Sequence, residues 1–162
     1  MRTHQRIIQP FLLLALVFFL ELSIAPLLGV VYGTAIIFFP AFFFVQMLSS
    51  SARPAVFYAG IFGILRDSIS LYPPGVWVLG FVVGVLAEQL MIYEIAMDRD
   101  GARFIVAALG VVVCYGVVFL VIGFYNHAIP SPGLFAREML MNGFWVLAIA
   151  CLTALKQLRF SR

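Results

Sequence analysis

Residues 55–93 read AVFYAGIFGILRDSISLYPPGVWVLGFVVGVLAEQLMIY, two apolar runs joined by a turn of two prolines and a glycine. Each run approaches or reaches the ~17–25 residues that an α-helix needs to cross about 30 Å of hydrocarbon. The turn Tyr72-Pro73-Pro74-Gly75 is too short for a wandering connection. The stretch therefore predicts two antiparallel membrane helices that lie side by side.

The composition extends this interpretation to the whole chain. It is 64% hydrophobic and 10% charged, whereas about a quarter of the residues in soluble domains are charged. We therefore expect a single all-α transmembrane domain over residues 1–162, a polytopic bundle of six helices. The six apolar runs cover residues 7–25, 32–48, 55–71, 76–93, 104–125 and 135–158.

The first run has an alternative interpretation as a secretory signal. Arg2 and Arg6 precede it, and Ser23-Ile24-Ala25 has the small-x-small pattern of a cleavage site. However, its apolar segment exceeds the ~7–15 residues usual in such signals, and Pro26 would directly follow the cut. We therefore expect this run to remain as the first helix.

The basic residues lie singly at the ends of apolar runs, so the net charge of +3 does not predict nucleic-acid binding. With the N-terminus inside, the cytoplasmic segments hold eight of them: Arg2, Arg6, Arg53, Arg99, Arg103, Lys156, Arg159 and Arg162. The outer loops hold Arg137 alone. This asymmetry predicts that both termini are cytoplasmic, which agrees with six spans.

Four ionisable residues interrupt the apolar runs: Glu21, Arg66, Asp67 and Glu88. A charge at the bilayer centre costs at least ~2.5–3.5 kcal/mol, so each needs a partner, a water-filled cavity or a function. Arg66 and Asp67 are adjacent and point about 100° apart on a helix, so they cannot simply neutralise each other. Glu21 lies about 21 Å and Arg66 about 16 Å from the inner ends of their helices, a gap that the long arginine stem can shorten. We therefore predict an ion pair between Arg66 and Glu21.

Two sets of residues each follow one helix face: Gly60, Gly63 and Asp67, and then Gly80, Gly84 and Glu88. The Gly80-x-x-x-Gly84 pattern lets another backbone approach closely, and packing within the chain is favoured over a dimer. Asp67 is expected to serve the contact between the third and fourth helices. Glu88, about 8 Å from the inner end of its helix, is expected to reach headgroup water.

These groups have two interpretations. One is an ion pair and a capped helix end that hold the bundle in one arrangement, or that bind a partner. The other is a proton or ion relay, or a substrate site at mid-depth. A relay usually consists of several ionisable groups along one path, whereas these carboxylates are spread over three helices. The structural or partner-binding role is therefore favoured.

Catalysis and metal binding have little support in the sequence. His127 stands in an outer loop beside Asn126, and no serine or cysteine nucleophile is identifiably paired with it. Ser68 and Ser70 are expected to hydrogen-bond to their own helix. The chain has no phosphate-binding loop and no Cys/His cluster, so we expect no catalytic residue, cofactor or metal. Pro40 should kink or break the second span, and such breaks can mark a binding site.

The segment from Gly60 to Leu79 resembles the MreD family of rod shape-determining membrane proteins. The shared pattern consists of glycines, an aspartate, a serine shortly afterwards, and a turn that ends in glycine before the next apolar helix. The positions that match this pattern are Gly63, Asp67, Ser70 and Gly75.

The end of the chain is also similar to the last helix of that family. It reads Met141-Asn142-Gly143-Phe144-Trp145, then an apolar run, then Lys156-Gln157-Leu158-Arg159. Arg66 departs from the family pattern, in which an apolar residue usually precedes the aspartate.

The resemblance implies a non-enzymatic scaffold of the bacterial cell-elongation machinery, which sets rod shape and directs lateral peptidoglycan synthesis at the inner membrane. It implies binding to MreC, a single-span protein with a periplasmic domain. Through MreC it implies a connection to MreB and to the elongation peptidoglycan synthases. No small-molecule ligand is expected.

The alternative to a scaffold is a component of a transporter. The substrate-binding S-components of energy-coupling vitamin or metal transporters have a similar number of helices in a chain of similar size, and the MreD family is thought to share their fold. They bind a substrate from outside beneath capping loops, and the outer loops of this chain are short for that purpose. A small lipid-modifying transferase is a third alternative.

Overall fold

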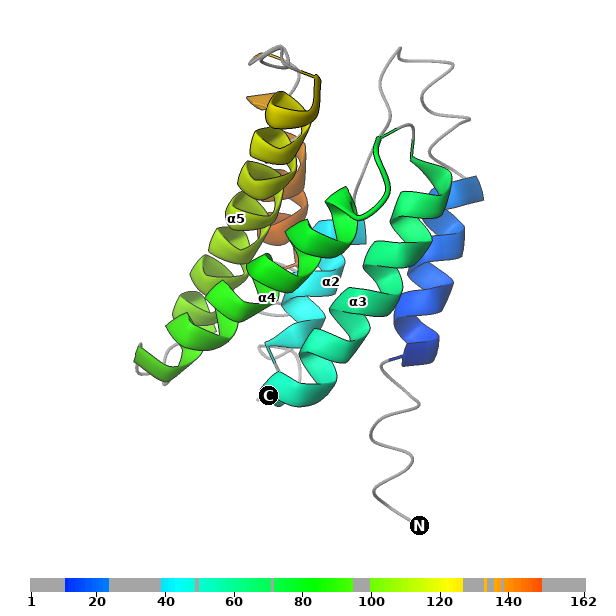
Figure 1. Ribbon diagram of the computed structural model, residues 1–162. Helices are drawn as coiled ribbons and strands as arrows, with labels where there is room; N and C mark the ends of the chain where they lie inside the picture. The colour runs from blue at the N-terminus through cyan, green and yellow to red at the C-terminus, as the bar shows by residue number, and fades with distance from the viewer. Residues whose placement is uncertain are drawn as a thin grey trace.

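The computed structural model is all-helical over the residues that it describes, which are 11–23, 39–48, 50–70, 72–94, 100–126, 133, 136–137 and 139–149. The expected all-α class is confirmed for this part of the chain. Its main helices are an N-terminal helix Phe11–Ser23, α2 (Phe39–Met47), α3 (Ala52–Ile69), α4 (Val76–Glu94), α5 (Asp100–Asn126) and a C-terminal helix Met139–Ile149. The N-terminal helix lies beside α3 on one side of the bundle, and α5 lies on the opposite side (Figure 1).

Helices α3 and α4 form the predicted antiparallel hairpin (Figure 1). Gly75 has a φ of +93°, a conformation that costs glycine little and most other residues much more. It lets the chain reverse directly after the two prolines, and α4 starts at the next residue. Helix α4 matches the predicted 76–93 to within one residue, and α3 starts three residues before the predicted 55–71.

The helix described within the predicted span 32–48 is α2, which begins at Phe39. It has nine residues, or about 14 Å of helix, which is half the hydrocarbon thickness. Pro40 lies in its first turn, where the missing N–H removes no helical hydrogen bond. Pro40 therefore does not interrupt α2. Residues 32–38 lie outside the described part of the chain, so a break of the span at Pro40 stays a prediction.

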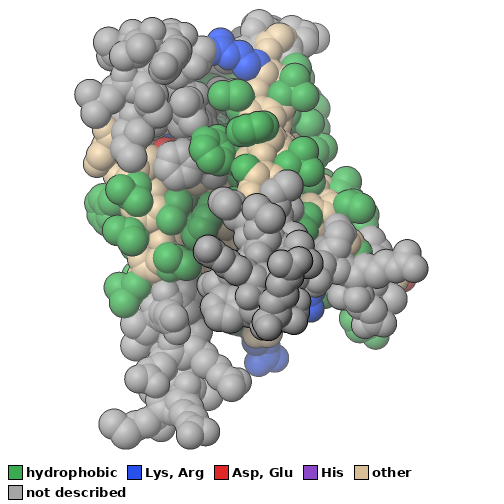
Figure 2. Space-filling view, turned by 180° about the vertical axis from the view of Figure 1, so that it is seen from behind, with side chains coloured by type: hydrophobic (Ala, Val, Ile, Leu, Met, Phe, Trp, Pro, Cys, Tyr) green, Lys and Arg blue, Asp and Glu red, His purple; other side chains and the backbone are tan. Residues whose placement is uncertain are grey.

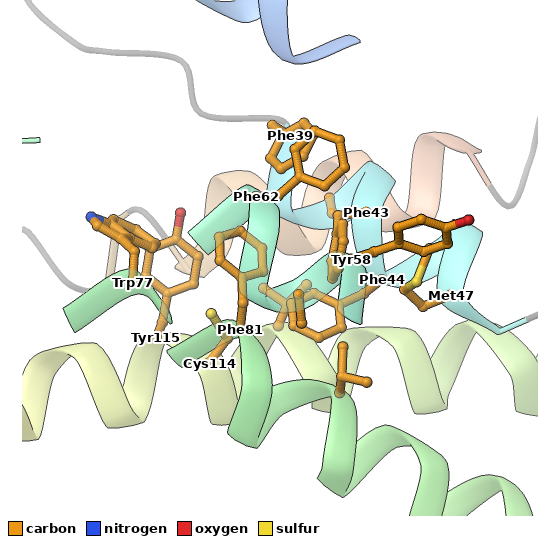
Figure 3. Packing of buried hydrophobic residues seen from close by; sticks show 14 of the residues in the cluster. Phe39, Phe43, Phe44, Met47, Tyr58, Phe62, Trp77, Phe81, Cys114 and Tyr115 are labelled. Atoms are coloured by element: carbon orange, nitrogen blue, oxygen red, sulfur yellow. The ribbon is translucent and has the colours of Figure 1, made fainter. Parts of the chain in front are cut away.

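Aromatic side chains fill the centre of the bundle (Figure 3). Phe39 and Phe43 of α2 are fully buried, as are Phe62 of α3 and Phe81 of α4. The ring centroids of Phe43 and Phe81 lie 4.9 Å apart in an edge-to-face arrangement, and those of Phe39 and Phe62 lie 5.2 Å apart. Phe44 of α2 is fully buried as well, so the phenylalanines that follow Pro40 in α2 contribute to the packing of the bundle.

Two helices, Val76–Glu94 and Ala102–Tyr125, are long and apolar enough to cross a membrane. The helices Phe11–Ser23 and Met139–Ile149 are apolar but shorter. Apolar side chains also cover the outside of the described helices (Figure 2). Exposed examples come from every long helix and include Leu16, Phe57, Leu90, Leu120 and Leu147. These features indicate that the protein associates with a membrane.

Candidate functional site

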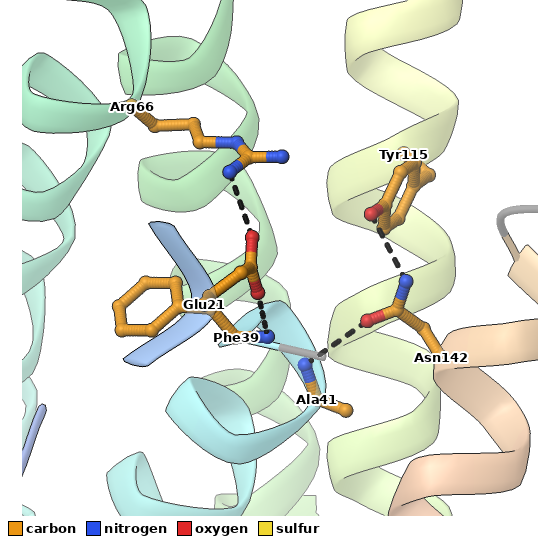
Figure 4. A network of polar contacts seen from close by, with 6 residues as sticks. All are labelled: Glu21, Phe39, Ala41, Arg66, Tyr115 and Asn142. Atoms are coloured by element: carbon orange, nitrogen blue, oxygen red, sulfur yellow. Dashed lines mark hydrogen bonds and ion pairs between the residues drawn. The ribbon is translucent and has the colours of Figure 1, made fainter. Parts of the chain in front are cut away.

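The predicted ion pair between Arg66 and Glu21 is present in the structure (Figure 4). The Arg66 Nη1 atom lies 2.7 Å from Glu21 Oε1, and the Glu21 side chain is only 2% exposed. The guanidinium also lies over the ring of Trp77, with Cζ 5.2 Å from the ring centroid, which is a cation–π contact. Arg66 thus links the N-terminal helix, α3 and α4.

The carboxylate of Glu21 has a second role at the N-terminus of α2. Its Oε2 atom accepts a hydrogen bond from the backbone N–H of Phe39 at 2.5 Å (Figure 4). The first N–H groups of a helix have no partner within the helix, and this end carries a partial positive charge that favours a carboxylate. Glu21 is therefore held from one side by Arg66 and from the other by α2.

Asn142 completes the capping of α2 from the C-terminal helix. Its Oδ1 atom accepts a hydrogen bond from Ala41 N at 3.2 Å, and its Nδ2 donates to the hydroxyl of Tyr115 on α5 at 3.0 Å (Figure 4). Because Pro40 has no N–H, Glu21 and Asn142 together satisfy the first two donors of α2. No capping role was predicted for Asn142, although it is the only amide or charged side chain in Met139–Ile149.

Asp67 joins α3 to the start of α4, as predicted. Its Oδ2 atom accepts hydrogen bonds from the backbone N–H groups of Gly75 at 2.9 Å and Val78 at 3.3 Å. Its Oδ1 atom accepts one from Trp77 N at 2.9 Å. The carboxylate therefore caps the next helix along the chain, and its contacts do not involve Arg66.

Of the two glycines predicted to share the packing face with Asp67, only Gly63 makes a close contact. A Cβ atom placed on Gly63 would lie 2.5 Å from the Cα of Val78, whereas one placed on Gly60 would meet nothing within 4 Å. Gly60 therefore makes no close contact at this interface. Ser70 donates to the backbone oxygen of Asp67 at 3.3 Å, so the predicted bond to its own helix is confirmed.

Gly80 and Gly84 pack against α5 of the same chain. A Cβ atom on Gly80 would lie 3.1 Å from the backbone oxygen of Cys114, and one on Gly84 would lie 2.9 Å from that of Gly110. The ring of Phe44 from α2 also fills the space beside Gly84 and Gly110. The predicted intrachain packing of the Gly80-x-x-x-Gly84 motif is thus confirmed.

Glu88 departs from the expectation that it reaches headgroup water. Its side chain is 0% exposed, and neither carboxyl oxygen has a hydrogen-bond partner. The depth of a residue along its helix does not determine its exposure, because neighbouring helices can cover the helix end as fully as the centre.

The arrangement is suited to fastening helices together. Glu21, Arg66 and Asp67 are engaged by partners within the chain. The described residues hold no group of three or more His, Cys, Asp or Glu side chains that could bind a metal ion. His127 and the side chain of Asn126 lie outside the described part. Comparisons of the chain with protein families, curated proteins and solved structures give no match.

Proposed function

We propose that this protein is a non-enzymatic scaffold of the MreD type in the bacterial inner membrane. In this proposal it binds MreC and acts through MreB and the elongation peptidoglycan synthases in rod-shape determination. The observation that carries the proposal is the construction of the α3–α4 hairpin. Gly63, Asp67 and Gly75, three of the four positions that carry the resemblance to that family, provide its close contact, its helix cap and its turn.

The charged side chains make their contacts within the chain, which favours a scaffold rather than a transporter that works by a proton or ion relay. A relay needs ionisable groups that can exchange protons or ions along a path. Glu21 and Arg66 instead form an ion pair, and Asp67 accepts hydrogen bonds from three backbone N–H groups. These residues fix the relative positions of the helices, which is what a partner-binding surface requires.

The filled centre of the bundle favours the scaffold over a substrate-binding S-component. A bound vitamin or metal would need a cavity with convergent polar groups. The buried rings of Phe39, Phe43, Phe62 and Phe81 occupy the centre of this bundle instead.

The topology that goes with this function is a six-span bundle with both termini in the cytoplasm. The exposed apolar side chains on the N-terminal helix, α3 and the C-terminal helix support it, because such surfaces are compatible with contact to lipid. We expect reporter fusions after Arg53, Arg103 and Arg162 to be active in the cytoplasm and one after Pro130 to be active in the periplasm. A periplasmic signal at Arg162 would show an odd number of spans.

Depletion of the protein tests the proposed function. A rod-shaped host should become round as the protein is lost, and expression of His127→Ala should restore rods, because the scaffold requires no general base. Cell width and length are measured by microscopy during depletion. Normal shape combined with lost uptake of a vitamin or metal would support the S-component alternative instead.

A further inference from the structure

Of the four ionisable residues that interrupt the apolar runs, Glu88 is the one that takes part in neither the ion pair nor the helix caps. It lies on α4 one turn beyond Gly84, on the helix face that Gly80 and Gly84 present to α5. The whole residue is buried, and neither Oε1 nor Oε2 has a hydrogen-bond partner. The side-chain nitrogen of the adjacent Gln89 is also buried and unpartnered, so it does not donate to Glu88.

No cation in the described part of the chain neutralises this carboxyl group. The helices packed against α4 carry four charged residues with described side chains: Arg53, Arg66 and Asp67 on α3, and Arg103 on α5. Arg53 and Arg103 are exposed, and α2 has no charged residue. Arg66 and Asp67 are engaged elsewhere, by Glu21 and by the start of α4.

An ionised carboxylate without a cation or a hydrogen-bond donor is far more costly to bury than a neutral carboxylic acid. We propose that Glu88 is a proton-binding site and that the folded protein holds it as a neutral acid at neutral pH. Loss of the proton would place a bare negative charge in the contact between α4 and α5. Proton binding at Glu88 therefore stabilises this contact, and this inference does not depend on the proposed function.

Infrared spectroscopy of the purified protein in mild detergent tests the proposal directly, because a protonated carboxyl group has a C=O band that carboxylates lack. The parent at neutral pH should show this band, and the band should shift when glutamate is labelled with ¹³C at its side-chain carboxyl. It should be lost in Glu88→Gln and retained in Glu94→Gln, a control that removes an exposed carboxyl group from the same helix.

Three results would overturn the proposal. The first is the absence of a protonated carboxyl band from the parent at neutral pH. The second is a band that does not shift with labelled glutamate, and the third is a band that persists in Glu88→Gln. If Glu88→Gln does not accumulate, the labelled parent is compared with Glu94→Gln and Glu138→Gln. Retention of the full band in both supports Glu88, because the remaining glutamate, Glu21, is paired with the guanidinium of Arg66, which favours its charged form. Loss of the band in either variant contradicts the proposal.

Discussion

Arg66→Leu should lower the free energy of unfolding by ~3–5 kcal/mol, and adding Glu21→Gln should recover most of that loss. The single substitution leaves the carboxylate of Glu21, which is 2% exposed, without its cation. The second substitution removes the charge but keeps a side-chain oxygen that can accept the hydrogen bond from Phe39 N. Recovery should be incomplete, because leucine cannot replace the cation–π contact with Trp77.

The stability of both variants is measured in mild detergent by unfolding the protein with heat or with denaturant. Arg53→Leu is the matched control, because Arg53 lies on the same helix and is exposed. The ion pair has no energetic role if Arg66→Leu is as stable as the parent and the second substitution changes nothing.

Gly63→Ala should destabilise the protein by ~1–3 kcal/mol or more through overpacking. The new Cβ atom would lie 2.5 Å from Val78 Cα and 2.9 Å from Val78 N, and backbone atoms cannot move aside as a side chain can. Relief of this clash would separate α3 from α4 and lengthen the hydrogen bonds from Trp77 and Val78 to Asp67.

Gly60→Ala is the matched control one turn away on the same helix. Alanine there meets nothing within 4 Å, and it should be neutral or stabilise the helix by up to ~1 kcal/mol. Equal effects of the two substitutions on thermal unfolding would show that the close approach at Gly63 does not limit stability.

The sequence was sufficient to predict features that depend on the geometry of a short turn or on the position of a residue along its helix. The short Pro-Pro-Gly turn forces α3 and α4 to be antiparallel, and helix rise places Glu21 and Arg66 at compatible levels. Both predictions are confirmed. The helical period placed Gly60 and Gly63 on one face, but it could not show that only Gly63 approaches α4 closely.

The remaining features depend on contacts between distant parts of the chain. Asn142 caps a helix 101 residues earlier in the sequence, and no local pattern specifies that partner. The burial of Glu88 likewise depends on how the surrounding helices cover α4. Asn142 could have been found by extending the search for polar groups in apolar runs from charged residues to amides.

Complementation of the depleted host with Arg66→Leu/Glu21→Gln is the most direct measurement of whether the buried charges serve structure alone. Cell shape is compared at protein levels matched to the parent. The double variant is expected to restore rods, because it removes the charges together and leaves the helix arrangement intact. A double variant that folds and accumulates to the parental level, yet leaves the cells round, would contradict a purely structural role and would show that the charges themselves act in the function.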